Sequence, residues 1–277
     1  MSTTKKDTIR IAILDLYEGH DNQGMRCIRD IIHLYCTKSD LHFEVAEFDV
    51  RLASALPDLS FDIYISSGGP GSPLDSEKSE WEKKYFQWIQ SLLDHNMSDA
   101  TNKKHVLFIC HSFQLACRFF KAAEVTKRKS TAFGIFPVHL TEEGKSEPIF
   151  AGLNDPFYVV DSRDYQVINP DTEYMHSIGA TLLCIEKERP HIPLQRAVMA
   201  IRFNDYMLGT QFHPEADAPG MRLYLQRMDK QQTVIDQHGY EKWRSMIEHL
   251  NDPDKIVATY HRFIPNFLEK AIETLKS

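Results

Sequence analysis

The sequence predicts an α/β fold: a doubly wound, mostly parallel sheet flanked by helices, with a helical C-terminal extension. Short apolar strand segments alternate with segments whose apolar residues recur at helical spacing, and this alternation is typical of parallel strands joined by right-handed crossovers. Glycine-rich or polar segments follow several of these strands, at the end of the sheet where sites usually lie. With 277 residues, the chain is long enough for one sizeable domain and an appendage.

The first half of the chain supplies the strand–helix units. Apolar runs predict strands at residues 9–16, 42–50, 61–66 and 106–109. Apolar residues at helical spacing predict one helix from Met25 to Tyr35 and another from Trp81 to Leu92. The nearly all-apolar segment 115–123 predicts a buried helix directly after the fourth strand. Asn22, in a polar loop that could contact a substrate, is expected to cap the first helix.

The second half changes in character after residue 130. Helical periodicity fades, and β-rich segments predict antiparallel strands at the edge of the sheet, at residues 132–140, 157–160, 181–186, 197–203 and 206–209. Beyond residue 218 three apolar stripes predict a helical tail, with Asp252-Pro253 beginning the last helix and Pro265 kinking or interrupting it. We therefore expect a domain of residues 1–218 and a helical extension of residues 219–277 packed on it.

Composition restricts the class of protein. The formal net charge of −7 argues against a general affinity for nucleic acid or acidic membranes. Five scattered cysteines without a Cys-x-x-Cys pair indicate neither a disulfide framework nor a zinc site. The polar N-terminus is followed by no secretory or membrane-spanning apolar run. We expect a soluble cytoplasmic protein that binds neither nucleic acid nor membranes and requires no metal or cofactor.

Cys110 lies where the fourth strand runs into the buried helix. A cysteine at such a junction is held on a sharp turn, and the N–H groups of the opening helix turn favour its thiolate, which can attack a carbonyl carbon. A lone cysteine in an apolar run is more commonly an inert core residue, and Cys117 is expected to be one. Two distant segments, 67–73 and 209–215, favour the catalytic interpretation of Cys110.

His213 and Glu215 flank a proline in the second of these segments. Proline fixes its own φ and biases the preceding residue to an extended conformation, so both side chains can point to one side of the backbone. The carboxylate could then orient the imidazole, which would pair with a thiolate and later protonate a leaving group. The other segment, Gly68-Gly69-Pro70-Gly71, could be only a tight turn, or could let the backbone approach a substrate closely.

Together these segments resemble the signature of the class I glutamine amidotransferases, over roughly the first four-fifths of the chain. The resemblance implies the flavodoxin-like fold of that family and a hydrolytic triad of Cys110, His213 and Glu215. It also implies the backbone N–H groups of Gly69 and His111 as oxyanion donors, Gly71 and Gln114 as contacts to the two ends of glutamine, and a further backbone contact from residues 161–166. The sequence departs from the family at Phe108 and Ser112, where the family usually carries glycine.

The resemblance implies an enzyme: a glutaminase that releases ammonia from the side-chain amide of glutamine through a γ-glutamyl thioester on Cys110. The tail has no Gly-rich nucleotide loop, so a separate synthetase subunit is expected to accept the ammonia. Two alternatives stay open. One is a γ-glutamyl hydrolase or transferase that acts without a partner, since the same triad serves both. The other is a noncatalytic regulatory protein of the same fold, which Ser112 and Phe108 motivate.

Overall fold

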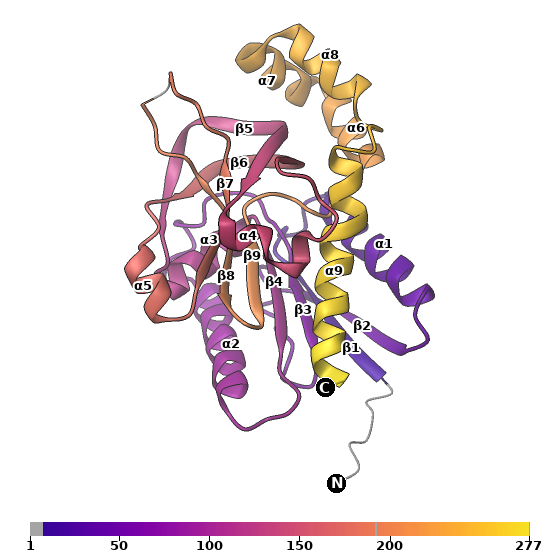
Figure 1. Cartoon of the computed structure of the whole chain (residues 1–277), viewed down its shortest axis with the longest axis vertical. Coiled ribbons are helices and arrows are strands. Elements are labelled where there is room, and N and C mark those ends of the chain that lie inside the picture. Colours follow the sequence, from indigo (N-terminus) through magenta and orange to yellow (C-terminus); the bar gives the residue numbers. More distant parts are fainter. Residues whose placement is uncertain (1–7, 192, 277) are drawn as a thin grey trace.

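The computed structural model describes residues 8–191 and 193–276, which form an α/β fold around one curled mixed sheet flanked by helices (Figure 1). The sheet has the strand order β2-β1-β3-β4-β9-β8-β7-β5-β6. Its strands are β1 Thr8–Asp15, β2 His42–Asp49, β3 Ile63–Ser66, β4 His105–Ile109, β5 Glu124–Leu140, β6 Phe157–Ile168, β7 Thr181–Glu186, β8 Val198–Asn204 and β9 Met207–Thr210. The helices are α1 Gln23–Thr37, α2 Glu80–Met97, α3 His111–Phe120, α4 Glu142–Lys145, the 3-10 helix η1 Pro148–Phe150, α5 Thr172–Ser177, α6 Ala218–Gln226, α7 Met228–His238, α8 Tyr240–Glu248 and α9 Ile256–Lys276.

The sheet is parallel in one half and antiparallel in the other. Strands β2, β1, β3, β4 and β9 run parallel, whereas the pairings β9–β8, β8–β7, β7–β5 and β5–β6 are antiparallel. The prediction of a mostly parallel sheet therefore holds for one half of the sheet only. The reason is connection length: β8 and β9 are joined by a short turn, and a short turn can only reverse the chain, while a parallel pair needs a crossover. The prediction of an antiparallel edge strand at 206–209 is wrong, because β9 runs parallel to β4 in the middle of the sheet.

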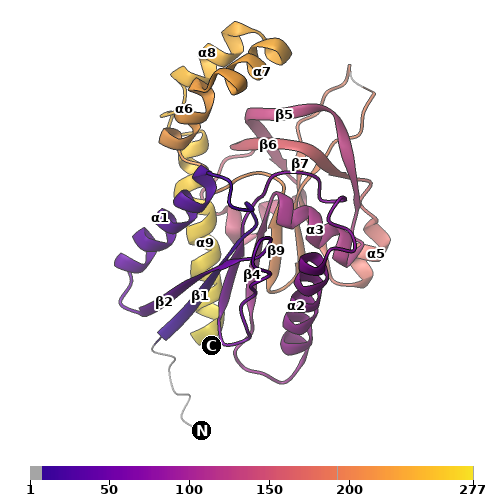
Figure 2. The same cartoon turned by 180° about the vertical axis from the view of Figure 1, so that it is seen from behind.

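Helices cover both faces of the parallel half, as a doubly wound sheet requires. Along β1, the side chains of Ile9, Ile11 and Ile13 belong to the core shared with α1 and α9, whereas Ala12 and Leu14 belong to the core shared with α2 and α3. Figure 1 shows α9 in front of the sheet, and Figure 2 shows α2 on the opposite face. This alternation explains why the strand reads as a continuous apolar run, since both of its faces are buried.

The two strands β5 and β6 extend well beyond the predicted segments. They form a long antiparallel pair between residues 124–138 of β5 and 157–168 of β6, with a register shift between Lys127 and Ala132. The N-terminal half of β5 is rich in exposed or half-buried polar residues. Sequence periodicity missed this part because its side chains face solvent and the register shift breaks the alternation.

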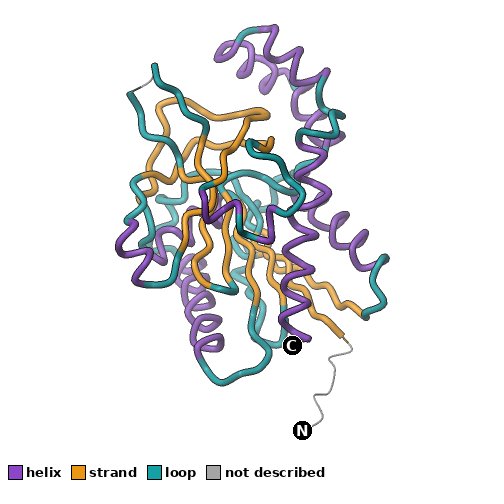
Figure 3. The backbone as a smooth tube through the Cα atoms, in the orientation of Figure 1, coloured by secondary structure: helices purple, strands orange, loops and turns teal. Residues whose placement is uncertain are grey.

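The tail consists of helices joined by short loops (Figure 3). The last helix begins at Ile256 rather than at Asp252-Pro253, because Asp252 instead accepts a hydrogen bond from the Asp254 N–H at 3.0 Å and closes a separate turn. Pro265 lies inside α9 and does not interrupt it. Among the described residues, no helix combines the length and apolar character needed to cross a bilayer.

Two apolar clusters hold the tail in place. Helix α9 contributes Phe263 and Ile264 to the main core beneath the sheet. Helices α6 to α8 instead form a smaller cluster against β5 and β6, made of Phe133, Ile135, Val160, Ala218, Met221, Leu225, Val234, Met246, Leu250 and Ile256. Helices α6 to α8 are therefore attached to the end of the β5–β6 pair, beside the carboxyl ends of the parallel strands.

Candidate active site

Three neighbouring parallel strands bring the predicted site residues together. Gly68 and Gly69 follow β3, Cys110 follows β4, and His213 and Glu215 follow β9. These strands are adjacent in the order β3-β4-β9. Because the carboxyl ends of parallel strands meet at one edge of a sheet, segments far apart in the chain converge there.

Cys110 is held in an unusual backbone conformation at the turn between β4 and α3. Its φ is 50° and its ψ is −97°, and a non-glycine residue in such a region costs on the order of 1–3 kcal/mol. Two hydrogen bonds hold this geometry: the Cys110 N–H donates to the Thr210 carbonyl at 2.7 Å, and the Cys110 carbonyl accepts from the Gln114 N–H at 3.0 Å. The sulfur lies 3.8 Å from the Ser162 carbonyl oxygen and 3.8 Å from Nε2 of Gln211.

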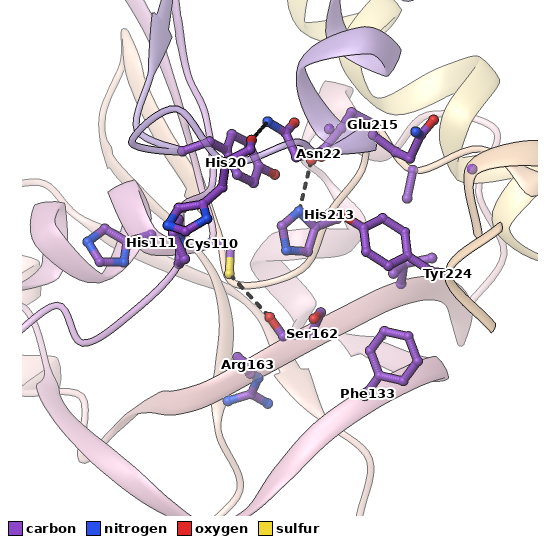
Figure 4. A pocket seen from close by; sticks show the side chains of 18 of the residues that line it. His20, Asn22, Cys110, His111, Phe133, Ser162, Arg163, His213, Glu215 and Tyr224 are labelled. Atoms are coloured by element: carbon purple, nitrogen blue, oxygen red, sulfur yellow. Dashed lines mark hydrogen bonds and ion pairs between the residues drawn. The ribbon is translucent and has the colours of Figure 1, made fainter. Parts of the chain in front are cut away.

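His213 lies beside this sulfur (Figure 4). Its N–H donates to the Val160 carbonyl at 2.9 Å, and its ring Nδ1 lies 2.8 Å from Oε1 of Glu215, which is 1% exposed. Burial by itself lowers the pKa of His213, but the charges of Glu215 and Cys110 and hydrogen bonds to both raise that pKa well above its ordinary value. The arrangement therefore favours a protonated His213 ring that lies between the Glu215 carboxyl group and the Cys110 sulfur.

His111 and Cys27 also line the cavity, and their surroundings make both unsuited to these roles. His111 is 1% exposed, and burial together with the charges of Arg51 and Arg118 lowers its pKa to about 3, so its ring stays neutral. Burial and the charge of Asp217 raise the pKa of the Cys27 thiol to about 12. Near neutral pH, His213 is therefore better suited than His111 to acid–base chemistry, and Cys27 remains an unreactive thiol.

Gly68 and Gly69, in the loop directly after β3, have no room for side chains. A Cβ on Gly69 would lie 2.4 Å from the Leu16 carbonyl oxygen, and a Cβ on Gly68 would lie 2.8 Å from Cε1 of His213. Both contacts are much shorter than van der Waals distances, so the backbone approaches the site only because these residues are glycine. Gly69 and His111, the predicted oxyanion donors, both line the cavity.

Two arginines hold the rest of this loop. Nη1 of Arg51 donates to the Pro70 carbonyl at 2.7 Å, and Nη1 of Arg118 donates to the Pro73 carbonyl at 2.6 Å. Gly71, between them, has a φ of 83°, which favours glycine, and lines the cavity. These charge-assisted hydrogen bonds fix the loop that carries two of the predicted substrate contacts.

Gln114 is buried, and its Nε2 donates to Oε1 of Gln211 at 3.1 Å. Because Gln211 also approaches the Cys110 sulfur, the two glutamines connect the predicted substrate contact to the nucleophile position. Within the segment 161–166, the carbonyl of Ser162 contacts the sulfur, whereas Asp161 is buried in an ion pair with Arg163 at 2.8 Å.

Phe108 fits the elbow strand because a glycine stands opposite it. Phe108 pairs with Gly209 across β4 and β9. A Cβ on Gly209 would lie 2.5 Å from Phe113, 3.2 Å from Phe203 and 3.4 Å from Cβ of Phe108. Because Gly209 has no side chain, Phe108, Phe113 and Phe203 can fill the space beside it.

Ser112 lies in the first turn of α3, with no positive φ, so its side chain causes no backbone strain. Its hydroxyl accepts from the Ile109 N–H at 2.7 Å and lies 2.8 Å from the Ser66 carbonyl oxygen. Ser66 is the last residue of β3. The Ser112 hydroxyl therefore bonds to backbone groups of both β3 and β4 at the point where the pairing of these strands ends. The hydroxyl therefore ties the nucleophile elbow to the neighbouring strand.

Replacing Ser112 with Ala should lower the free energy of unfolding by about 1–3 kcal/mol, because the buried Ile109 N–H loses its acceptor. Urea denaturation of wild-type and variant protein measures this difference. Ser91→Ala, which removes an exposed helical hydroxyl bonded to the Gln87 carbonyl, is the matched control and should change the stability by less than about 0.5 kcal/mol. Equal stability of Ser112→Ala and wild type would contradict the assigned role of the hydroxyl.

The cavity above Cys110 has a volume of about 390 Å³. Its wall includes the loop 20–24, in which Asn22 caps α1 by accepting from the Met25 N–H at 2.8 Å, as predicted. The opposite wall comes from the tail, because α6 begins directly after the His-Pro-Glu segment. Asp217 caps α6 and accepts from Nη2 of Arg26 at 2.7 Å. This ion pair fixes the start of the tail against α1 at the edge of the cavity.

Several cavity residues were not predicted from the sequence: Tyr17, Phe133, Met221, Tyr224, Arg227 and Lys230. Tyr17 follows β1, so its place at the carboxyl end of a parallel strand was an available signal. The others come from β5 and the tail, and nothing in their local sequence indicates a site. Among the described residues, no group of three or more His, Cys, Asp or Glu side chains could hold a metal ion.

The fold and this site define a class: an α/β protein with a cysteine on a strained strand–helix turn, beside a His–Glu pair and a glycine loop. The sequence matches the model of the family "Glutamine amidotransferase class-I" over residues 26–226. The chain therefore belongs to the class I glutamine amidotransferase family.

Solved structures agree with the fold. A glutamine amidotransferase from Thermotoga maritima superposes with a TM-score of 0.65 at 17% identity, over 96% of this chain and 98% of that chain. The glutaminase domain of Trypanosoma brucei CTPS with bound acivicin superposes with a TM-score of 0.55 at 15% identity, over 89% and 97%. A homoserine O-acetyltransferase of Phocaeicola vulgatus is 28% identical over 114 residues, which are 41% of this chain. The chain matches only 34% of the length of that relative.

Proposed function

We propose that this protein hydrolyses the side-chain amide of glutamine through a γ-glutamyl thioester on Cys110 and delivers the ammonia to a separate synthetase. The observation that supports this best is the contact of Cys110 with a histidine whose pKa a buried carboxylate raises. Members of the family are generally cysteine-dependent amide hydrolases that use glutamine and usually work with a synthetase.

In the proposed reaction, the Cys110 thiolate attacks the γ-carbonyl carbon of glutamine. The oxyanion accepts hydrogen bonds from the N–H groups of Gly69 and His111, each contributing about 3 kcal/mol to the transition state. The C–N bond breaks as His213 gives its proton to the leaving nitrogen, and ammonia departs. Neutral His213 then takes a proton from water, which attacks the thioester, releasing glutamate and restoring the thiolate. Glu215 keeps the imidazole in the required orientation.

The remaining assignments are part of the same proposal. Gly71 and Gln114 would hold the α-amino and carboxylate groups of glutamine. Residues 1–218 would form the catalytic domain, with residues 219–277 as an extension that covers one side of the cavity. A cytoplasmic location and the lack of any required metal or cofactor stay predictions from composition.

One observation favours a second candidate, a γ-glutamyl hydrolase or transferase that needs no partner. A cavity of about 390 Å³ is in the range that usually holds drug-sized ligands, and glutamine is much smaller. The noncatalytic alternative loses support, because Phe108 and Ser112, which motivated it, are accommodated without displacing Cys110.

Labelling with a diazoketone analogue of glutamine tests the proposal. We expect one adduct per chain by mass spectrometry, on the peptide that contains Cys110, because the buried Cys27 thiol stays protonated. Ammonia release from glutamine should also rise when proteins that co-purify with the chain are added. A chain whose Cys110 never reacts, with or without those proteins, would exclude both enzyme functions and leave the noncatalytic one.

A further inference from the structure

On the far side of His213 from Cys110, aromatic and basic side chains also line the cavity. Figure 4 shows the His213 ring between the Cys110 sulfur and the Tyr224 ring, with the Phe133 ring below Tyr224. All four residues line the same cavity. Phe133 comes from β5 and Tyr224 from α6, so this part of the wall exists only because the tail packs against the β5–β6 pair.

The position of the leaving nitrogen decides which part of a substrate would enter this region. The group that protonates the leaving nitrogen must contact that nitrogen, so in the proposed mechanism the amide nitrogen lies on the His213 side of Cys110. When glutamine is the substrate, the leaving group is ammonia, which has no substituent that could reach this region. A substituted amide nitrogen would carry its substituent past His213, toward Phe133 and Tyr224.

Tyr224 is half-buried and Phe133 is 4% exposed, and both rings line the cavity. These rings suit an apolar substituent, since aromatic side chains supply apolar contact surface. A basic side chain lies over each of the two rings. Nζ of Lys230 lies 5.4 Å from the centre of the Phe133 ring, and Cζ of Arg227 lies 5.6 Å from the centre of the Tyr224 ring. A ligand that reaches these rings therefore lies close to two cations.

Of these two cations, Lys230 is the one available to a ligand. Arg227 forms an ion pair with Asp229 at 3.0 Å, whereas Lys230 forms none within the part of the chain that the structure describes. Two carboxylates that also line the cavity are already engaged: Asp217 pairs with Arg26, and Asp164 accepts from the Thr131 hydroxyl. Asp21, the remaining aspartate of the wall, is exposed on the loop before α1.

We propose that the site takes γ-glutamyl peptides whose second residue is apolar, with its side chain between Phe133 and Tyr224 and its terminal carboxylate at Lys230. The inference rests on the proposed thioester chemistry of Cys110. Cys110 attacks the γ-carbonyl carbon, the C–N bond to the second residue breaks, and His213 protonates the amino group that leaves. Water then hydrolyses the thioester to glutamate, so no oxidant or cofactor is needed.

Turnover by the full-length protein tests this with three substrates: glutamine, γ-glutamylphenylalanine and γ-glutamylphenethylamine, which lacks the carboxylate. We expect kcat/KM for γ-glutamylphenylalanine to exceed that for glutamine at least tenfold, and removal of the carboxylate to cost about fivefold to tenfold. Released glutamate and amine are quantified by chromatography.

Lys230→Met should remove the preference for γ-glutamylphenylalanine over γ-glutamylphenethylamine. Lys255→Met is the matched control, because Lys255, like Lys230, lies over an aromatic ring, that of Tyr158 at 5.6 Å, but does not line the cavity. This control should keep the preference of wild type. A Lys230→Met preference equal to that of wild type would overturn the placement of the carboxylate.

The outcomes separate this inference from the function on which it rests. If glutamine is hydrolysed and γ-glutamylphenylalanine is not, the inference is wrong and the glutaminase proposal stands. If γ-glutamylphenylalanine is cleaved by the protein alone, the inference is supported whatever a synthetase does. If neither substrate reacts and the diazoketone does not label Cys110, the proposed chemistry itself fails.

Discussion

Replacing Cys110 with Ala should lower amide hydrolysis by about 10⁴-fold or more, to background, because no other thiol of the cavity can form the acyl intermediate. Cys27, which also lines the cavity, has its pKa raised to about 12 by burial and by Asp217, so it cannot substitute at neutral pH. The rate of glutamate formation from glutamine, with co-purifying proteins present, measures the effect.

Cys27→Ala serves as the control in the same assay. It removes a cavity thiol without touching the strained turn between β4 and α3, so most of the activity should remain. Circular dichroism of both variants should match that of wild type, since each change deletes a single sulfur atom. Wild-type turnover by the Cys110 variant would end the assignment of the nucleophile.

Replacing Glu215 with Gln should lower kcat by about 10³–10⁴-fold. It should also narrow the pH profile of kcat/KM, because the alkaline limb moves to lower pH. Although burial alone lowers the pKa of His213, Glu215 and Cys110 raise it well above the ordinary value, so the imidazolium persists through neutral pH in the wild type. Loss of the negative charge lowers that pKa. The alkaline limb of kcat/KM, which reports loss of the imidazolium proton, should therefore move to lower pH.

The raised pKa of His213 also makes the stability of the fold depend on pH. A histidine whose pKa is raised on folding stabilises the fold fully below its ordinary pKa, and this contribution is lost as the pH rises through the folded value. Glu215→Gln should therefore lose more stability near pH 6 than at strongly alkaline pH. Glu77→Gln, an exposed change away from the cavity, should alter neither profile. An unchanged alkaline limb in the Glu215 variant would show that Glu215 does not set the pKa of His213.

Much of the fold was predictable, because its signals are local. A parallel strand buried on both faces reads as a continuous apolar run, and β1, β3 and β4 were found in this way. The polar part of β5 and the start of α9 were not predicted correctly. A solvent-facing strand with a register shift has no apolar period, and Asp252-Pro253 closes its own turn rather than the first turn of the helix.

The motifs of the sequence indicated which residues form the site, but only the structure showed that β9, predicted as an antiparallel edge strand, runs parallel to β4 in the middle of the sheet. Cys110, the Gly68-Gly69 loop and the His213–Glu215 pair each follow a strand, and parallel strands in adjacent positions must bring their carboxyl ends together. The tertiary structure alone decided how the two departures at the elbow are tolerated. Gly209 lies opposite Phe108 across two strands, and the partners of Ser112 include Ser66 on a third.

Tertiary structure also decided the shape of the far side of the cavity. Phe133, Tyr224 and Lys230 meet there because helices α6 to α8 bury their apolar faces against β5 and β6. Amphipathic helices specify that a face must be buried, but not against which surface. Residues that reach a site through such packing therefore leave no motif in the sequence, and only the folded chain reveals them.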